Sequence, residues 1–159
     1  MKVDLLKQKL LRGISKKKLS ILNDIIQNKK PCSLRIIEWF VSSYSREKRV
    51  SYLLNGNQFN VYSSYKDEQL SSYNKKLFDM YRRMKTFDIK LDNGKVLTTT
   101  VAQLNFFNWM FKNKILEYIV KNLDSIKKDL EENKKKKISR NKFFDDVNIV
   151  RIKITIKFD

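Results

Sequence analysis

The stretch that decides the fold is residues 100–123, TVAQLNFFNWMFKNKILEYIVKNL. Its apolar residues recur at spacings of three and four and widen to nearly all sides of a helix. The main stripe runs on to Leu130 and consists of Val101, Leu104, Phe107, Phe111, Ile115, Ile119, Leu123, Ile126 and Leu130. Because a helix that is apolar on most faces is a buried helix, we predict a central core helix here. Thr100 and Gln103 fit a capping box at its start, and a bend is expected near Lys112–Lys114.

Two β-hairpins are predicted before this helix. Residues 49–54 alternate apolar and polar side chains, Asn55-Gly56 follows, and the return strand is expected over residues 59–65. An Asn-Gly pair favours a tight hairpin turn because both residues tolerate positive φ. Residues 87–98 repeat the pattern around the turn Asp92-Asn93-Gly94. Together the two hairpins predict a small antiparallel sheet.

Helices are predicted in the rest of the N-terminal half. Apolar residues recur at helical spacing within residues 3–28 on both sides of Gly13, which indicates one or two amphipathic helices. These helices either dock on the body or form a basic arm that engages phosphates or anionic lipid. Ser33 is a typical N-cap for a helix over residues 34–45, and a polar helix is expected over residues 67–77.

The C-terminal region predicts a long basic strand. Residues 150–158 alternate strictly, and the polar side of the alternation carries Arg151, Lys153 and Lys157. Residues 127–142 hold eight basic residues and are predicted to be an exposed loop. The fold class is therefore α+β: hairpins and a C-terminal strand packed on a central helix. We divide the chain into a basic helical arm, residues 1–31, and an α+β body, residues 32–159.

Composition excludes several kinds of site. The chain of 159 residues has no histidine and one cysteine, Cys32. Histidine-dependent nucleophile pairs, imidazole metal sites and intramolecular disulfides are therefore excluded. The three glycines stand far apart, at positions 13, 56 and 94, so no glycine loop for phosphate is present. We expect a protein that is not an enzyme, with no cofactor, no metal and no membrane span.

The positive charge indicates a polyanionic partner. Lysine and arginine number 35 against 17 acidic residues, a formal net charge of +18. An AT-rich genome explains lysine over arginine, yet it raises glutamate as readily as lysine, so the excess of bases over acids needs another cause. A strongly positive field gathers nucleic acid, anionic membrane or acidic protein. Nucleic acid, in the first place double-stranded DNA, is the expected partner.

Four basic segments are candidate contact surfaces. The richest interleaves aromatic and basic residues, which suits contacts to bases and phosphates. The candidate residues are Lys16, Lys17, Lys18, Lys66, Tyr73, Lys75, Lys76, Tyr81, Arg82, Arg83, Lys134, Lys135, Lys136, Lys137, Arg140, Lys142, Arg151, Lys153 and Lys157. For each segment the alternative is structural: a solvated face, tyrosines packed on the core, or an edge strand charged against aggregation.

A metal-dependent nuclease is a third possibility, because Asp88-Ile89-Lys90 resembles an acid–x–lysine core on a strand. Phe87 and Ile89 already account for that strand as a structural element. The pair Asp145-Asp146 is interpreted as a turn before the C-terminal strand.

Several segments resemble an uncharacterised family of small basic proteins from the large nucleocytoplasmic DNA viruses of algae and protists. The matching residues are Phe59-Asn60-Val61-Tyr62, Tyr65-Lys66, Tyr73, Lys75-Lys76, Phe78-Asp79, Arg82-Arg83, Thr98-Thr99-Thr100, Gln103-Leu104-Asn105-Phe106-Phe107, Trp109 and Lys157-Phe158-Asp159. They cover roughly residues 33–159. The resemblance implies a viral source and favours a virion component, and it implies no activity.

The function expected from these observations is sequence-independent binding of nucleic acid during genome packaging or condensation. The alternative is a structural virion protein, a minor capsid or cement component whose helices and basic surface contact other virion proteins. Either protein would reside in the virion, and in the host cytoplasm (viral factory) or nucleus during assembly. Oligomers are compatible with both.

Overall fold

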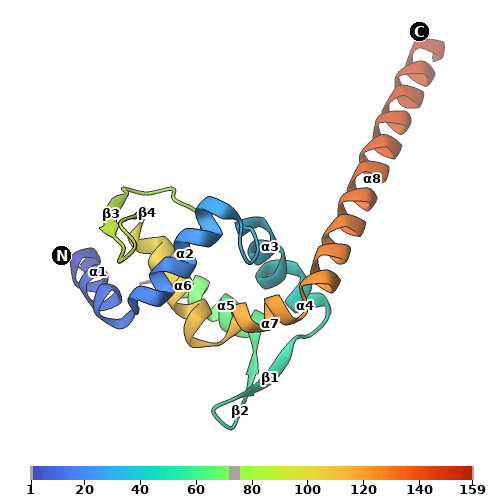
Figure 1. Ribbon diagram of the computed structural model, residues 1–159. Helices are drawn as coiled ribbons and strands as arrows, with labels where there is room; N and C mark the ends of the chain where they lie inside the picture. The colour runs from blue at the N-terminus through green and yellow to red at the C-terminus, as the bar shows by residue number, and fades with distance from the viewer. Residues whose placement is uncertain (1, 72–75, 159) are drawn as a thin grey trace. The chain divides into compact units, whose positions relative to one another are not determined.

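The computed structural model describes the backbone of residues 2–71 and 76–158 and the side chains of residues 3–71 and 76–143. The chain divides into two compact units, residues 1–123 and residues 124–159. In the first unit the described elements are α1 (Lys2–Gly13), α2 (Lys16–Asn28), α3 (Leu34–Trp39), the π-helical turn η1 (Phe40–Tyr44), α4 (Ser45–Glu47), β1 (Ser51–Leu54), β2 (Asn57–Asn60), α5 (Val61–Leu70), β3 (Phe87–Lys90), β4 (Val96–Thr99), α6 (Val101–Lys112) and α7 (Ile115–Lys121) (Figure 1). The second unit is formed by α8 (Leu123–Phe158).

Helix α6 is the core helix that the sequence predicts. Leu104, Phe107 and Met110 are fully buried, and most of the other residues of α6 are buried with them. The helix starts where Thr100 Oγ1 accepts a hydrogen bond of 3.0 Å from the backbone N–H of Gln103. After Lys112 the chain turns through Lys114, whose φ is 54°, and α7 begins. The predicted bend is confirmed as a break between two helices.

The N-terminal helices dock on this core. Ser15 caps α2, because its Oγ accepts a 3.2 Å hydrogen bond from the N–H of Lys18. Leu10, Leu22 and Ile25 from the two helices are buried. Helix α1 packs against α6, and α2 packs against β4. The apolar stripe of residues 3–28 is therefore part of the core of the first unit, while lysines of both helices face solvent.

Both predicted hairpins form, each as a separate two-stranded antiparallel sheet. In the first, Tyr52 lies opposite Phe59 and their ring centroids are 5.4 Å apart. In the second, Lys90 pairs with Val96 around the turn at Gly94. The single small sheet expected from the sequence is thus replaced, among the described residues, by two independent hairpins.

The return strand of the first hairpin is shorter than predicted. It ends at Asn60, whose side-chain oxygen accepts a 2.9 Å hydrogen bond from the N–H of Ser63 and starts α5. Val61 and Tyr65 were expected on one side of a strand, but they also stand four residues apart, and both are buried on one face of α5. The predicted strand over 59–65 is therefore wrong beyond Asn60. Of the helix predicted over 67–77, residues 67–70 are helical as the end of α5, residues 71, 76 and 77 are not, and residues 72–75 lie outside the described residues.

The predicted C-terminal strand and the exposed loop predicted over residues 127–142 are also replaced by helix. Residues 127–142 and 150–158 both lie within α8, which is continuous from Leu123 to Phe158. An unpaired strand leaves its N–H and C=O groups without partners, whereas a helix satisfies them within the segment. Seven of residues 123–142 are lysine, which favours helix, and the segment contains no glycine or proline. The sequence also places Val150, Ile154 and Phe158 four apart, a spacing that suits a helix as well as a strand.

The helical segment before the first hairpin is confirmed with its cap. Ser33 Oγ accepts a 3.4 Å hydrogen bond from the N–H of Ile36. The helix widens into the π turn η1, where Ser42 Oγ donates a 2.6 Å hydrogen bond to the carbonyl of Glu38. Trp39 is half-buried. This segment fixes the backbone position of Glu38 on α3.

Candidate nucleic-acid interface

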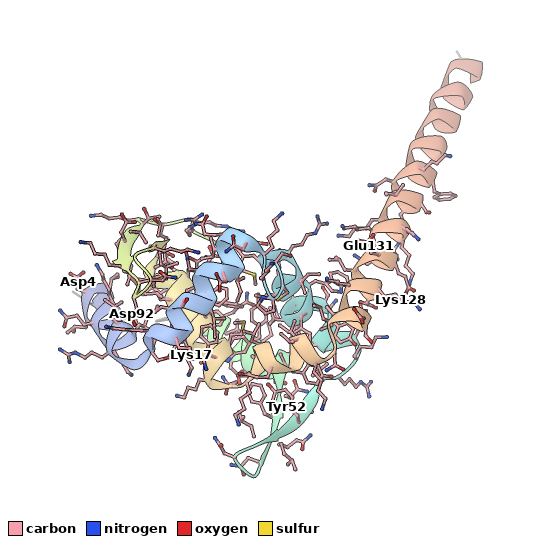
Figure 2. All side chains as sticks on the ribbon, in the orientation of Figure 1. Asp4, Lys17, Tyr52, Asp92, Lys128 and Glu131 are labelled. Carbon is pink, nitrogen blue, oxygen red and sulfur yellow. The ribbon has the colours of Figure 1, made fainter. Side chains whose placement is uncertain are left out.

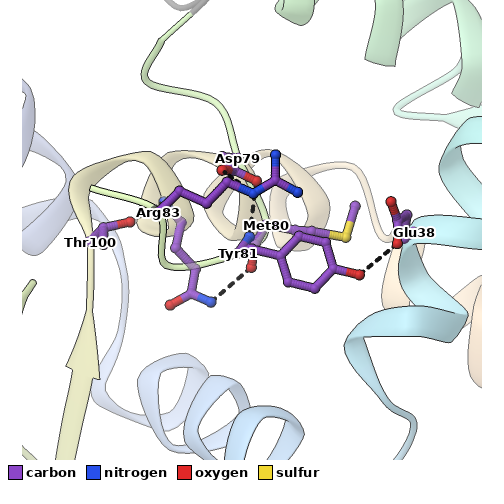
Figure 3. Close-up of polar contacts among 7 residues, drawn as sticks. Glu38, Asp79, Met80, Tyr81, Arg83 and Thr100 are labelled. Carbon is purple, nitrogen blue, oxygen red and sulfur yellow. Dashed lines mark hydrogen bonds and ion pairs between the residues drawn. The ribbon is translucent and has the colours of Figure 1, made fainter. Parts of the chain in front are cut away.

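The basic loop, residues 76–86, precedes β3 and is held on its core side by two amide side chains of α6, the buried Gln103 and the part-buried Asn105. Gln103 Nε2 donates a 2.8 Å hydrogen bond to the carbonyl of Met80 (Figure 3). Asn105 Nδ2 donates a bond of the same length to the carbonyl of Leu77. Thr99 Oγ1 donates to Gln103 Oε1 at 2.7 Å and so orients the amide. The loop has little regular secondary structure, yet its backbone is fixed to the core.

Apolar side chains anchor the same loop. Phe78 is buried with its ring centroid 5.1 Å from that of Phe106 and 5.6 Å from that of Trp109. Leu77 and Met80 are buried beside it in the chain. Because these residues occupy the core side, the residues that follow them face outward. Arg82, Arg83 and Lys85 are all exposed.

Tyr81 connects the basic loop to α3. Its hydroxyl donates a 2.5 Å hydrogen bond to Glu38 Oε2, and its N–H donates a 3.1 Å bond to Asp79 Oδ1 (Figure 3). Burial, the hydrogen bond to Glu38 and the charge of that carboxylate raise the pKa of Tyr81 to about 12, against the opposing charges of Arg83 and Arg35. Tyr81 is therefore a neutral hydrogen-bond donor at physiological pH.

The two arginines of the loop are positioned differently. Arg83 Nε lies 3.6 Å from Asp79 Oδ2, and its guanidinium lies over the Tyr81 ring at 5.3 Å from the centroid. Arg82 Nη1 donates a 3.2 Å hydrogen bond to the carbonyl of Thr98 on β4. An arginine held by one or two of its donors keeps the others for a phosphate, which it binds in a forked geometry. The loop therefore presents two oriented cations.

A cavity of about 540 Å³ opens beside the loop. Aromatic and methionine side chains form part of its wall, and charged or amide side chains form the rest. The polar part of the wall includes Glu38, Gln69, Lys76, Asp79, Tyr81 and Arg83. The structure thus brings Lys76, Tyr81 and Arg83 of the interleaved segment together around one hollow, which the sequence did not predict.

Lys66 lies on α5 and takes part in the neighbouring polar contacts. Its Nζ donates a 3.4 Å hydrogen bond to Gln69 Oε1, and Gln69 Nε2 donates a 2.8 Å bond to the Tyr65 hydroxyl. Burial, followed by the charges of Glu38 and Asp79, raises the pKa of Tyr65. Tyr73 and Lys75, which the sequence also singled out, lie outside the described residues.

The lysines at the start of α2 form a second exposed cluster. Lys16, Lys17 and Lys18 all face solvent, and Lys16 Nζ lies 3.3 Å from Asp92 Oδ1 in the turn of the second hairpin. Figure 2 shows the side chains of this region, with Lys17 and Asp92 labelled. The contact with Asp92 is between exposed groups and contributes little to stability.

The third cluster is helical. Lys135, Lys136, Lys137, Arg140 and Lys142 are exposed on α8, and Lys134 Nζ lies 3.5 Å from Glu131 Oε1. Successive residues of a helix are rotated by about 100°, so four consecutive lysines spread around α8. Arg151, Lys153 and Lys157 belong to the backbone of the same helix, and their side chains lie outside the described ones.

Sequence reasoning missed Glu38, Gln69 and the anchoring role of Gln103. Gln103 was assigned only to a capping box, but its side chain reaches Met80 and Thr99 instead of the N-cap backbone. The available signal was a polar residue inside an otherwise apolar helix, since buried polar groups are normally hydrogen-bonded. Glu38 and Gln69 gave no such signal, because both are ordinary polar residues of amphipathic segments.

The described residues also bear on the remaining sequence hypotheses. Asp88 Oδ1 accepts a 2.7 Å hydrogen bond from Thr98 Oγ1 across the second hairpin, which gives this acid a structural contact. Among the side chains that the structure describes, no group of three or more cysteine, aspartate or glutamate residues is placed to hold a metal ion. In the same part of the chain, no helix has the length and apolarity needed to cross a membrane.

Comparison with known proteins identifies relatives of this chain. It is 34% identical over 121 residues to an uncharacterized protein of Acanthamoeba polyphaga mimivirus, an alignment covering 70% of this chain and 46% of the relative. The chain thus spans about half the length of that relative. This similarity supports a viral origin and confirms the resemblance to uncharacterised viral proteins. No solved structure matches the chain. Residues 2–150 match a sequence family, DUF7197, which is described as a family of unknown function, and the chain belongs to this family.

Proposed function

We propose that this protein binds nucleic acid through phosphate contacts, without sequence specificity, and that it packages or condenses a viral genome. The observation that carries the proposal is the basic loop, in which Arg82, Arg83 and Lys85 are exposed while the backbone beneath them is fixed to α6. Because the loop backbone is already fixed, binding a phosphate chain costs little backbone conformational entropy.

Charge supports the same conclusion. Residues 1–123 contain 24 basic and 10 acidic residues, a net charge of +14, so most of the excess lies in the first unit. Between side chains that the structure describes, three ion pairs form, and they leave most basic residues available to a polyanion. The attraction is long-ranged at low ionic strength and weakens as salt is added.

Phosphate contacts position a protein on nucleic acid and carry no sequence information. Binding through the basic loop is therefore expected on any sequence, with double-stranded DNA as the first partner to test. A protein of this kind would reside with the genome in the virion, and in the viral factory or nucleus during assembly.

The test is the salt dependence of binding to a duplex of random sequence. If about six phosphates are neutralised, log affinity falls against log salt with a slope near −5. The variant Arg82→Gln/Lys85→Gln removes two cations of the basic loop and should flatten that slope by about 2. The matched control Lys48→Gln/Lys95→Gln removes two exposed cations from other turns of the first unit and should flatten it less.

Two results would contradict the proposal. If binding to the duplex is weak at low salt and its affinity does not change as salt is added, nucleic acid is not the partner. Equal losses in the two double variants show that net charge alone, and not the basic loop, determines binding.

A structural virion protein is the second candidate, and exposed apolar residues of α1 favour it. Leu5 is 66% exposed, and Val3 and Leu11 are also exposed. Isolated apolar residues at a surface are common, but several on one short helix suit a protein contact. Fractionation of nuclease-treated particles separates the two functions, because a capsid component stays with the shell after the genome is removed.

A further inference from the structure

We propose that the cavity beside Tyr81 receives one unpaired nucleobase bearing an exocyclic amino group, so that on single strands a preference for such bases is added to the sequence-independent phosphate contacts. The inference rests on the proposed function, because the basic loop that lines the cavity is the surface assigned there to phosphates.

The size and wall of the cavity suit a flat aromatic ligand. Its volume of about 540 Å³ lies within the range of about 300–1,000 Å³ that small-molecule sites occupy. Three aromatic residues line it: Tyr65, Phe78 and Phe106. The ring centroid of Phe78 lies 6.1 Å from that of Tyr65 and 5.1 Å from that of Phe106. These rings are less than a tenth exposed, so they form an apolar floor against which a nucleobase can pack.

The polar groups of the cavity are not equally available to a ligand. Asp79 uses Oδ1 for the N–H of Tyr81 and Oδ2 for Arg83. Glu38 accepts the Tyr81 hydroxyl through Oε2. An ionised carboxylate offers about four acceptor positions. Both oxygens of the part-buried Asp79 already have a partner, whereas the contact described for the exposed Glu38 carboxylate uses Oε2, so Oε1 of Glu38 is the more accessible acceptor. Glu38 is therefore the group that we assign to the base.

A carboxylate discriminates between bases. It accepts a hydrogen bond from the N4 amino group of cytosine. Thymine presents the carbonyl O4 at the equivalent position, and two acceptors repel each other. Glu38 is exposed, and the hydrogen bond from Tyr81 restrains its carboxylate beside the cavity.

Lys76 and Arg83 place the sugar-phosphate chain at the rim. Both are exposed and both line the cavity. A base in a duplex is stacked, and its amino edge is paired, so it enters such a cavity only after it is extruded. An unpaired base enters without that cost, which favours single strands.

The test uses the full chain with three labelled ligands of equal length: oligo-dC, oligo-dT and a mixed duplex. Wild type should bind oligo-dC about fivefold or more tightly than oligo-dT. Glu38→Gln removes one negative charge, which favours every polyanion, and it also removes the carboxylate that would accept from the base. The variant should therefore lose the preference for oligo-dC while it binds oligo-dT and duplex at least as tightly as wild type.

Glu47→Gln is the matched control. Glu47 is exposed on α4 and does not line the cavity, and its replacement by glutamine also removes one negative charge. This variant should bind all three ligands slightly more tightly and keep the preference. Gln at position 38 can still accept from Tyr81, and a circular dichroism melt checks that the variant is folded.

Competition on wild-type protein gives a reading that needs no substitution. Deoxycytidine monophosphate should displace labelled oligo-dC more effectively than thymidine monophosphate. Equal affinity of wild type for oligo-dC and oligo-dT, or a preference that survives Glu38→Gln, overturns the cavity proposal and leaves phosphate binding intact. Mononucleotide selectivity without oligonucleotide selectivity makes the cavity a site for free nucleotides. Failure of all three ligands to bind at low salt overturns the proposed function itself.

Discussion

Gln103 and Met80 join the core of the protein to its most basic surface: the buried amide of Gln103 donates a 2.8 Å hydrogen bond to the Met80 carbonyl. Gln103 is fully buried in the first turn of α6, and Met80 is immediately followed by Tyr81, Arg82 and Arg83. The geometry of the basic loop is thus determined by a residue that faces away from solvent.

Replacing Gln103 should therefore affect both stability and binding. Gln103→Leu keeps the volume but leaves the Met80 carbonyl and the Thr99 hydroxyl without this partner, which should cost about 1–3 kcal/mol of unfolding free energy. Urea unfolding measures the loss. Gln58→Leu, at an exposed position of β2, serves as the control and should change the free energy by no more than about 0.5 kcal/mol. Equal midpoints for the two variants would show that the amide contributes nothing.

Two glycines should respond to alanine with opposite signs. Gly56 has φ of 81° in the first hairpin turn, a conformation that strains any residue with a Cβ, so Gly56→Ala should destabilise the protein by about 1 kcal/mol or more. Gly13 ends α1, and a Cβ built there meets nothing within 4 Å. Gly13→Ala should therefore stabilise by about 0.4–1 kcal/mol, because alanine restricts the unfolded chain. Thermal melts of the two variants would contradict this account if both shifts had the same sign.

Tyr81 should make the free energy of unfolding depend on pH in the alkaline range. Its pKa is about 12 in the folded protein, against the ordinary tyrosine value of 10.0. A raised folded pKa means that the neutral hydroxyl is favoured by folding, so this contribution is complete below pH 10 and is lost as pH rises towards 12. The difference in unfolding free energy between wild type and Tyr81→Phe should therefore shrink across that window. Lysines also titrate between pH 10 and 12, but their contribution is the same in wild type and Tyr81→Phe and cancels in the difference. A difference that stays constant with pH would exclude the Tyr81 contact with Glu38 as its source.

Local signals explain what the sequence predicted correctly. The N-cap at Ser33, the Asn55-Gly56 turn and the break near Lys114 each depend on a few neighbouring residues, and all three were found. The apolar stripe of α6 was found because a buried helix needs apolar residues on most sides. Of the candidate residues, Lys76, Tyr81 and Arg83 line one cavity and Arg82 contacts β4, a grouping that the interleaving of aromatic and basic residues did not specify.

The errors arose where two structures fit one pattern. Val61 and Tyr65 satisfy both a strand alternation and a helix spacing, and the side chain of Asn60 decides for the helix by capping it. The alternation of residues 150–158 required a partner strand, which no sequence pattern could guarantee. Glu38 could not be assigned to the site in advance, because it meets Tyr81 across 43 residues of sequence. Contacts of this range depend on how the helices pack, and single-sequence patterns do not contain that information.

The run Lys134–Lys137 on α8 has a mechanical consequence for any polyanion that it meets. Because its four charges point in different directions around the helix axis, the segment has no single binding face. A rod charged on several sides can contact two separate strands at once and draw them together, which a one-sided basic patch cannot do. Crosslinking of neighbouring strands, rather than tight seating of one, is the behaviour that this geometry favours.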